Sequence, residues 1–423
     1  MLTKEKYSQF VRILEEELVP AMGCTEPVAI AYAGAKARQV LGETPISAKI
    51  EVSGNIIKNV KSVIVPHTDG MRGIESALAA GIAVGNADAE LEVVANVRKE
   101  DVEKIAAFRA ACPITVFRSC SDAVFEINVS LASASHTASV KILDNHTNVV
   151  AIEKDGEVLF RNEQAAKKRK TDRNCLSVEE IVQFADQVEI DDVRAVLDRQ
   201  IECNMAIAEE GLKNDYGANI GKVYLNSYPD DVRCKAKAYA AAGSDARMNG
   251  CEMPVIINSG SGNQGITASV PVIVYAREMG LEREKLYRAL CVSNLITVHL
   301  KTGIGTLSAY CGVVSAGAGA ACGVAYLFGG DLRVISHTLV NALAMDSGVI
   351  CDGAKASCAA KIAIAVESGL LGLKMYEQGN QFYAGDGIVK KGVEKTIRSV
   401  SRLAHEGMRA TDEEIIRIMI EDV

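Results

Sequence analysis

The chain has 423 residues, of which 48% are hydrophobic and 24% are charged, and its formal net charge is -8. This length allows a large buried core and favours two domains over one. The negative charge balance excludes an ordinary nucleic-acid-binding protein, because such a protein needs a basic surface. The basic run at residues 167–170 stands in polar sequence and is interpreted as a solvated linker rather than a binding patch.

The start of the chain and its cysteines bear on the cellular compartment. No basic and apolar leader follows Met1, and the twelve cysteines are typical of reduced thiols rather than of a disulfide framework. Residues 307–330 carry no charge, but they are rich in Ala, Gly, Ser and Cys, which gain little from lipid, so we expect buried helices there. We therefore expect a cytoplasmic protein that binds no membrane and no nucleic acid. The sequence leaves open whether it forms a homo-oligomer.

The first 85 residues are expected to begin with two helices. Residues 3–19 have apolar positions at helical spacing, and a second helix is expected from Thr25, as its N-cap, to Gly42. Two short strands around a turn at Gly54-Asn55 should follow, and then a helix at residues 74–84.

Alternating apolar and polar residues dominate the next part of the chain. Strands are expected at residues 91–97, 114–119, 125–133, 138–145, 148–156 and 157–160, with a helix at about 100–110. From about Ser177 onward the pattern is helical and rich in Ala and Gly. We therefore predict a mainly α fold with an inserted α+β domain: residues 1–85 and 171–423 form a large helical catalytic domain, and residues 86–170 form the insertion.

Three cysteines in the C-terminal half are candidate metal ligands: Cys311, Cys351 and Cys358. The last two are seven residues apart, a rise of about 10 Å in one straight helix. An N-cap at Asp352 and a bend at Gly353 would let the sulfurs converge, with Cys358 in the second turn of the helix. The helix N-terminus would stabilise an anionic centre, and zinc fits poorly because there is no CxxC pair or nearby His. Cysteines that occur incidentally in a buried helix are the alternative.

Three further segments could carry chemistry. Cys24 stands between Gly23 and a helix start, an environment that lowers a thiol pKa, although a packed, inert cysteine would look the same. Residues 259–265, SGSGNQG, offer consecutive backbone N–H groups to a carboxylate or phosphate, but they match no Walker A or dinucleotide motif and could be a plain loop. His67 lies in a loop between a strand and a helix, either as a ligand-binding or as a surface residue.

These segments together resemble a known family. The motifs AMGCTEPVAIAYAGAKA, SGNIIKNVKSVIVPHTDGMRGI, NSGSGNQGITASVPV, AYCGVVSAGAGAACG and MDSGVICDGAKASCAAK are similar to those of the L-cysteine desulfidases, which are related to the iron–sulfur-dependent L-serine dehydratases. The resemblance runs from about residue 10 to 410. The short interval between the last two cysteines favours the desulfidases. The loop at residues 66–70 departs from the Pro-Gly-Thr-Gly-like run expected there.

The resemblance implies a [4Fe–4S] cluster on Cys311, Cys351 and Cys358, with Cys24 as the base that takes the α-proton or, alternatively, as a fourth ligand. It implies a small amino-acid substrate, held by Ser261, Gly262, Asn263 and Gln264, with Asn55 and Lys58 as further candidates, and no pyridoxal phosphate. The expected reaction is the conversion of L-cysteine to pyruvate, ammonia and sulfide. The alternatives are an L-serine dehydratase, which releases water, and a non-catalytic iron–sulfur sensor.

Overall fold

The structure is a computed structural model that describes residues 2–23, 25–121, 123–162, 171–305 and 308–421. It divides into two compact units. The helical unit comprises residues 1–22, 169–351 and 356–412, and the sheet unit comprises residues 23–168, 352–355 and 413–423. The predicted fold class, mainly α with an α+β portion, is confirmed by the order of the elements.

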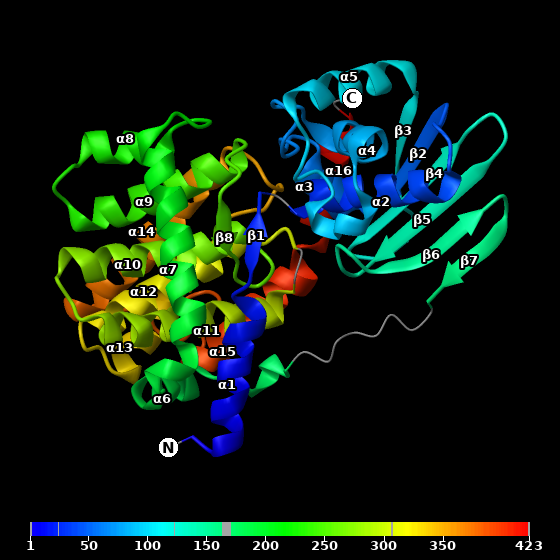
Figure 1. Cartoon of the computed structure of the whole chain (residues 1–423). Helices are drawn as coiled ribbons and strands as arrows, with labels where there is room; N and C mark the ends of the chain where they lie inside the picture. Colours follow the sequence, from blue (N-terminus) through cyan, green and yellow to red (C-terminus); the bar gives the residue numbers. More distant parts are fainter. Residues whose placement is uncertain (1, 24, 122, 163–170, 306–307, 422–423) are drawn as a thin grey trace. The chain divides into compact units, whose positions relative to one another are not determined.

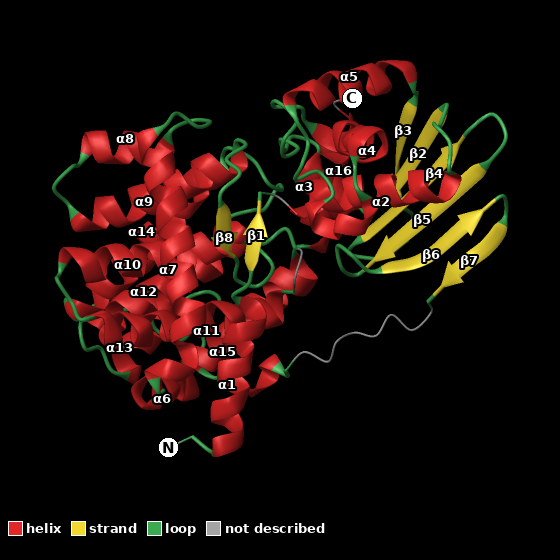
Figure 2. Cartoon of the chain, in the orientation of Figure 1, coloured by secondary structure: helices red, strands yellow, loops and turns green. Residues whose placement is uncertain are grey.

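The sheet unit is built on one mixed sheet with the strand order β3-β2-β4-β5-β6-β7 in its described residues. Strand β2 pairs in parallel with β3 and antiparallel with β4, and the remaining pairs are antiparallel. Helices α2 and α4 lie over one face of the sheet (Figure 2). The elements are α2 (Thr25–Leu41), β2 (Ser47–Val52), α3 (Gly54–Val60), α4 (Gly73–Val84), η1 (Ala87–Glu92), α5 (Lys99–Ala111), β3 (Ile114–Arg118), β4 (Glu126–Ala132), β5 (Thr137–Leu143), β6 (Val149–Lys154) and β7 (Glu157–Arg161).

Alternation along the strands builds the core of this unit. Ile50 and Val52 of β2, Val129 of β4 and Val140 of β5 are fully buried on the face that meets the helices. Helices α2 and α4 approach closely because Gly81 has no side chain: a Cβ there would collide with the backbone of Ala31. Gly81→Ala is therefore incompatible with this packing.

The helical unit places α12 among α10, α11, α13 and α14 (Figure 1). The small residues of α12 permit this close packing of helices, since a Cβ on Gly317 would lie 2.5 Å from the backbone of Ala365 in α14. The elements are α1 (Lys4–Glu17), β1 (Pro20–Met22), η2 (Arg173–Cys175), α6 (Val178–Gln187), α7 (Ile190–Lys213), α8 (Ile220–Ser227), α9 (Val232–Met248), β8 (Pro254–Ile256), α10 (Gly262–Glu278), α11 (Arg283–Ile304), α12 (Gly312–Leu327), α13 (Leu332–Asp346), α14 (Cys358–Glu377), α15 (Val393–Arg402), η3 (Leu403–Gly407) and α16 (Arg409–Glu421), whose last residues belong to the sheet unit.

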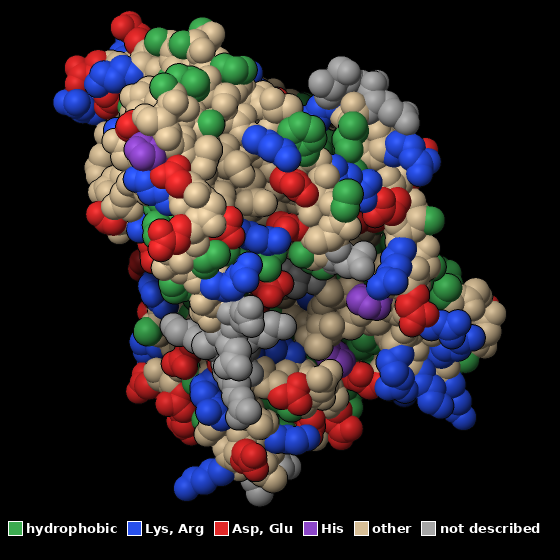
Figure 3. All heavy atoms as spheres, turned by 90° about the vertical axis from the view of Figure 1, so that its right-hand side faces the viewer, with side chains coloured by type: hydrophobic (Ala, Val, Ile, Leu, Met, Phe, Trp, Pro, Cys, Tyr) green, Lys and Arg blue, Asp and Glu red, His purple; other side chains and the backbone are tan. Residues whose placement is uncertain are grey.

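The uncharged stretch at residues 307–330 contains α12, which is buried in protein. Within the described part of the chain, no helix is long and apolar enough to cross a bilayer. On the face drawn in Figure 3, acidic and basic side chains are interspersed.

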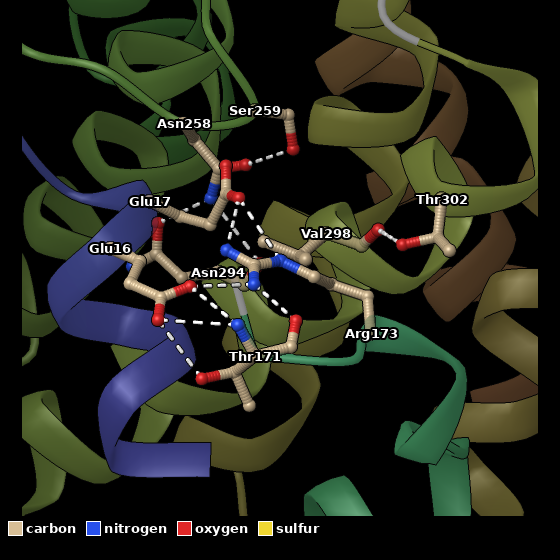
Figure 4. A network of polar contacts seen from close by, with 9 residues as sticks. All are labelled: Glu16, Glu17, Thr171, Arg173, Asn258, Ser259, Asn294, Val298 and Thr302. Atoms are coloured by element: carbon tan, nitrogen blue, oxygen red, sulfur yellow. Dashed lines mark hydrogen bonds and ion pairs between the residues drawn. The ribbon is translucent and has the colours of Figure 1, made fainter. Parts of the chain in front are cut away.

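An ion-pair network ties the first helix to the segment that re-enters the helical unit. Arg173 lies between two carboxylates of α1, with its Nη1 2.6 Å from Glu16 and its Nη2 2.7 Å from Glu17 (Figure 4). Thr171 donates both its backbone N–H and its hydroxyl to Glu16. These contacts fix residues 171–175 against α1.

Three parts of the structure differ from the sequence-based expectations. Residues 23–85 belong with the sheet, because β2 pairs with β3 and β4 and α2 packs on the strands, so the sheet unit begins well before residue 86. Residues 54–60 form helix α3 after the extended Ser53, where a turn and a strand were expected. Residues 91–92 end the 3-10 helix η1 and residues 93–96 form turns, where a strand was expected at 91–97; the consecutive Val93 and Val94 are both buried, whereas an alternating strand would bury only one.

Candidate functional site

Cys311 and Cys351 lie on two short extended segments that pair with each other in the helical unit. The backbone N–H of Cys311 donates to the carbonyl of Val349 at 3.0 Å, and that of Cys351 donates to Ala309 at 2.6 Å. Tyr310 and Ile350 form the antiparallel bridge between them. This pairing brings together two cysteines that are 40 positions apart in the sequence.

The third cysteine begins a helix beside this pair. Cys358 is the first residue of α14, with Ser357 as its N-cap, so the predicted N-cap at Asp352 and the second-turn position of Cys358 are wrong. Residues 352–355 stay non-helical because Gly353 has a φ of 93°, outside the helical region. Lys361, one turn into α14, donates to the carbonyl of Ile350 at 3.1 Å and so ties the helix to the segment that carries Cys351.

The Cys311 thiol is influenced by both of the other cysteines. A hydrogen bond with Cys351, burial and the charges of Cys351 and Cys358 together raise the pKa of the Cys311 thiol well above its usual value. Cys311 is also buried, with 5% of its surface exposed. A neutral thiol is thus favoured when nothing positive is bound between these sulfurs, and a bound cation would reverse that preference.

The donor set consists of thiols. Among the described residues, no group of three or more His, Cys, Asp or Glu side chains is arranged to hold a single metal ion. Cysteine thiolates are the usual ligands of iron–sulfur clusters, in which each cysteine binds a different iron. Cys311, Cys351 and Cys358 offer three such thiols.

Three helices begin at or near this site, namely α10, α12 and α14. Cys311 is the N-cap of α12, and Gly312 is its first residue. A Cβ on Gly312 would lie 2.6 Å from the amide carbon and nitrogen of Gln264, so the side chain from the first turn of α10 packs directly against Gly312. Helix N-termini carry partial positive charge and unpaired N–H groups, which favour anionic ligands.

The segment before α10 is held by buried amides. Asn258 donates to the carbonyl and side-chain oxygens of Asn294 in α11, at 3.3 and 3.0 Å, and accepts from the Ser259 hydroxyl (Figure 4). Ser259 and Gly260 have positive φ, and Ser261 then caps α10 by accepting from the N–H of Gln264. The predicted substrate loop is therefore a fixed turn that opens a helix, where a plain flexible loop was the alternative.

Buried polar atoms without partners accompany these segments. Among the described residues, neither Oε1 of Gln264 nor Oγ of Ser315 has a hydrogen-bond partner. Gln264 touches Gly312, and Ser315 lies in the first turn of α12. Native proteins satisfy nearly all such atoms, and an exception indicates a strained or ligand-binding site. The residues around Cys311 therefore fit a site that receives a further group.

The other predicted residues lie in the sheet unit. Cys24 is outside the described residues, and helix α2 begins at Thr25. Asn55 and Lys58 lie on α3, with Lys58 almost fully buried. A Cβ on Gly353 would collide with the Lys58 carbonyl, so residues 352–355 pack closely on α3. His67 has a φ of 59° in the loop between α3 and α4.

Sequence reasoning missed a polar cluster in the sheet unit. The carboxylate of Glu26 accepts from Nδ2 of Asn59 and from the hydroxyl of Thr25, and its charge acts on His146. His146 is 120 positions away in the loop between β5 and β6, and no spacing in the sequence connects it to Glu26.

A separate hollow in the helical unit does not involve these residues. A hollow of about 760 Å³ in the helical unit is lined by α6, the start of α11 and the turn before α13. None of the predicted site residues lines it. Its lining is largely charged and includes none of the three cysteines.

Comparison with known proteins identifies the family. The model of the serine dehydratase alpha chain matches residues 88–417. The chain belongs to this family. It is also 56% identical over 416 residues to a UPF0597 protein of Desulfitobacterium hafniense, a match that covers 98% of this chain and 97% of the relative. UPF0597 proteins of Lachnoclostridium phytofermentans and Treponema denticola are 50% and 47% identical, covering 98% and 100% of this chain and 100% of each relative. The expected relationship to serine dehydratases is confirmed, and the desulfidase specificity stays a prediction.

Proposed function

We propose that the protein is a lyase that eliminates the β-substituent of a small L-amino acid, with L-cysteine as its substrate. The observation that carries this proposal is the convergence of Cys311, Cys351 and Cys358 beside helix N-termini in the helical unit. Membership of the serine dehydratase alpha chain family supports the reaction class. L-Serine is the second candidate substrate, and the family description favours it directly.

A [4Fe–4S] cluster fits these thiols, with Cys311, Cys351 and Cys358 as its ligands. When bound, it supplies an iron without a protein ligand, which acts as a Lewis acid toward the substrate and its leaving group. The pairing of residues 309–311 with 349–351 and the bond from Lys361 to the Ile350 carbonyl support this proposal, because they hold the backbone segments that carry Cys311 and Cys351. No pyridoxal phosphate enters this proposal.

The first turn of α10 is proposed to hold the substrate carboxylate. Ser261, Gly262, Asn263 and Gln264 lie at a helix N-terminus whose N–H groups and partial charge suit an anion. The fixed turn at Asn258 and Ser259 orients them, and the Gln264 amide reaches Gly312, the residue after Cys311. Asn55 and Lys58 stay as proposed substrate contacts on α3.

Cys24 is proposed as the base. Its thiolate would take the α-proton, the freed electron pair would form the Cα–Cβ double bond, and the Cβ–S bond would break to release sulfide. The aminoacrylate product then hydrolyses to pyruvate and ammonia. In the sequence, Cys24 is the residue before Thr25, with which α2 begins. If Cys24 is instead a cluster ligand, His67 is the next candidate base.

Anaerobic reconstitution followed by assays with both amino acids tests this function. We expect about four irons and four sulfides per chain, with sulfide, ammonia and pyruvate released in equal amounts from L-cysteine. L-Serine should react more slowly because thiolate is the better leaving group and the softer iron ligand. Faster turnover of serine would establish the dehydratase instead. A cluster without turnover of any amino acid would favour the sensor.

Single substitutions separate the ligands from the base. Cys311→Ser, Cys351→Ser and Cys358→Ser should each lose the cluster, whereas Cys24→Ser should keep its iron and visible absorption but lose turnover and α-proton exchange. Cys203→Ser, at a half-buried cysteine of α7, is the matched control and should behave as the unmodified chain. Iron loss in Cys24→Ser equal to that in Cys351→Ser would show that Cys24 is a ligand.

A further inference from the structure

Arg247 lies against the helix N-terminus that is proposed to hold the substrate carboxylate. It stands in the last turn of α9, and its guanidinium packs on Gly262, the first residue of α10: a Cβ on Gly262 would lie 2.3 Å from Nε and 2.7 Å from Cζ of Arg247. Nη1 of Arg247 also donates to Oδ1 of Asn263, the second residue of α10, at 3.3 Å. These contacts place a positive charge at the start of α10, and all three residues belong to the helical unit.

The absence of a side chain at Gly262 makes this approach possible. A Cβ on a helix is tilted toward the helix N-terminus, so the space that it would occupy lies beside the first N–H groups of α10. The guanidinium of Arg247 fills that space, and Cγ2 of Val255 closes it from β8, 2.8 Å from the same point. A larger residue at position 262 would therefore push the guanidinium away from the helix N-terminus.

The start of α10 and the guanidinium together offer N–H donors and positive charge to one anion. The first N–H groups of a helix have no partner within it, and the helix dipole adds partial positive charge. A guanidinium carries five N–H donors in a planar fork, which matches the two oxygens of a carboxylate. Gln264 in the same turn is 6% exposed, and within the described chain its Oε1 has no hydrogen-bond partner, which independently indicates that this turn receives a further polar group.

We infer that Arg247 is the charged partner of the substrate carboxylate at the start of α10. This inference rests on the proposed function for the identity of the ligand. It gives Arg247 a role that neither the sequence motifs nor the family match assigns. The guanidinium would donate two N–H groups to the two carboxylate oxygens, and it would select a carboxylate over a neutral amide of the same shape.

The test compares two ligands of nearly the same shape. Propionate carries a negative charge and propionamide carries none, and neither can be eliminated. Their dissociation constants for the full-length protein, reconstituted with iron and sulfide, are measured by ligand-observed NMR under anaerobic conditions. The unmodified chain should bind propionate more tightly. Arg247→Met should weaken propionate binding by about 10- to 100-fold, the loss expected when hydrogen bonds between charged groups are removed, and should leave propionamide binding nearly unchanged.

Further substitutions separate carboxylate binding from a purely structural role. Arg247→Lys keeps the charge but loses the planar pair of donors, so it should retain only part of the preference for propionate. Gly262→Ala keeps the guanidinium but displaces it, because the new Cβ would lie 2.3 Å from Nε, and it should reduce the same preference. Arg277→Met is the matched control, since Arg277 lies in the last turn of α10, pairs with Glu209 at 3.2 Å and has 52% of its side chain exposed. This control should leave both dissociation constants unchanged.

Thermal unfolding establishes that each variant is folded. If Arg247 only braced the start of α10, Arg247→Met would weaken both ligands equally, and that result would overturn the inference. Equal binding of propionate and propionamide by the unmodified chain would overturn it as well. A preference for propionate that depends on Arg247, without turnover of L-cysteine or L-serine, would instead refute only the proposed reaction.

Discussion

Gly312→Ala should disturb the proposed carboxylate site without unfolding the protein. An added Cβ would lie 2.6 Å from the Gln264 amide, whereas ordinary contacts begin near 3.4 Å, so the amide must move by about 0.8 Å. Displacement by about 1 Å in a catalytic site can reduce the rate 10²-fold. We therefore expect kcat/KM for L-cysteine to fall by about 10²-fold.

The fold should tolerate the same substitution. Gly312 begins α12, and the atom that must yield is the end of a flexible side chain, so the cost is about 1 kcal/mol, partly offset by the helix propensity of Ala. Iron content and thermal unfolding should stay near those of the unmodified chain. Gly348→Ala is the control, because a Cβ there meets nothing within 4 Å.

The steady-state assay is repeated in a Gln264→Ala background. If the added methyl group acts through Gln264, the double variant should have a kcat/KM only slightly lower than that of either single variant, because both substitutions remove the same contact. Full additivity, or unchanged kcat/KM in Gly312→Ala, would refute the role given to this amide.

Two further predictions concern acid stability and cluster retention. Burial raises the pKa of Glu16, but hydrogen bonds from Arg173 and Thr171 outweigh it and hold that pKa below its usual value of 4.5. The ionised Glu16 carboxylate therefore stabilises the fold fully above pH 4.5, and this stabilisation is lost as the pH falls through the lowered pKa. The free energy of unfolding in urea falls between about pH 6 and 3, and Glu16→Gln should make this fall less steep. A parallel slope in the variant would contradict this. Lys361→Met removes the bond to Ile350 and should speed iron release to a chelator about tenfold, and unchanged release would show that the tether is dispensable.

Local patterns predicted much of the fold. Strands β3 to β7 follow alternating residues, and α1, α4 and α5 follow helical spacing and end signals, all of which act over a few positions. The assignment of residues 23–85 needed non-local information, since β2 joins the sheet only by pairing with strands that follow more than 60 residues later.

In the candidate site too, local features could be predicted from the sequence and contacts between distant residues could not. The sequence alone pointed to the three cysteines and to the SGSGNQG run. It also predicted that Cys358 lies near a helix N-terminus, although the helix begins six residues later than its expected cap at Asp352. The contact of Gln264 with Gly312 joins residues that are 48 positions apart in the sequence. No helix propensity or hydrophobic periodicity encodes such a pair.

The start of α10 gives a last prediction. Its unpaired N–H groups and its partial positive charge suit a carboxylate, and the Gln264 amide in its first turn lies against Gly312.

Propionate tests this preference, because it carries a carboxylate and no ammonium group. Gln264→Ala should weaken propionate binding by at least about tenfold, while thermal unfolding stays near that of the unmodified chain. Unchanged propionate binding would refute the contact between the Gln264 amide and the carboxylate. A lower unfolding temperature would instead show that the substitution disturbs the fold.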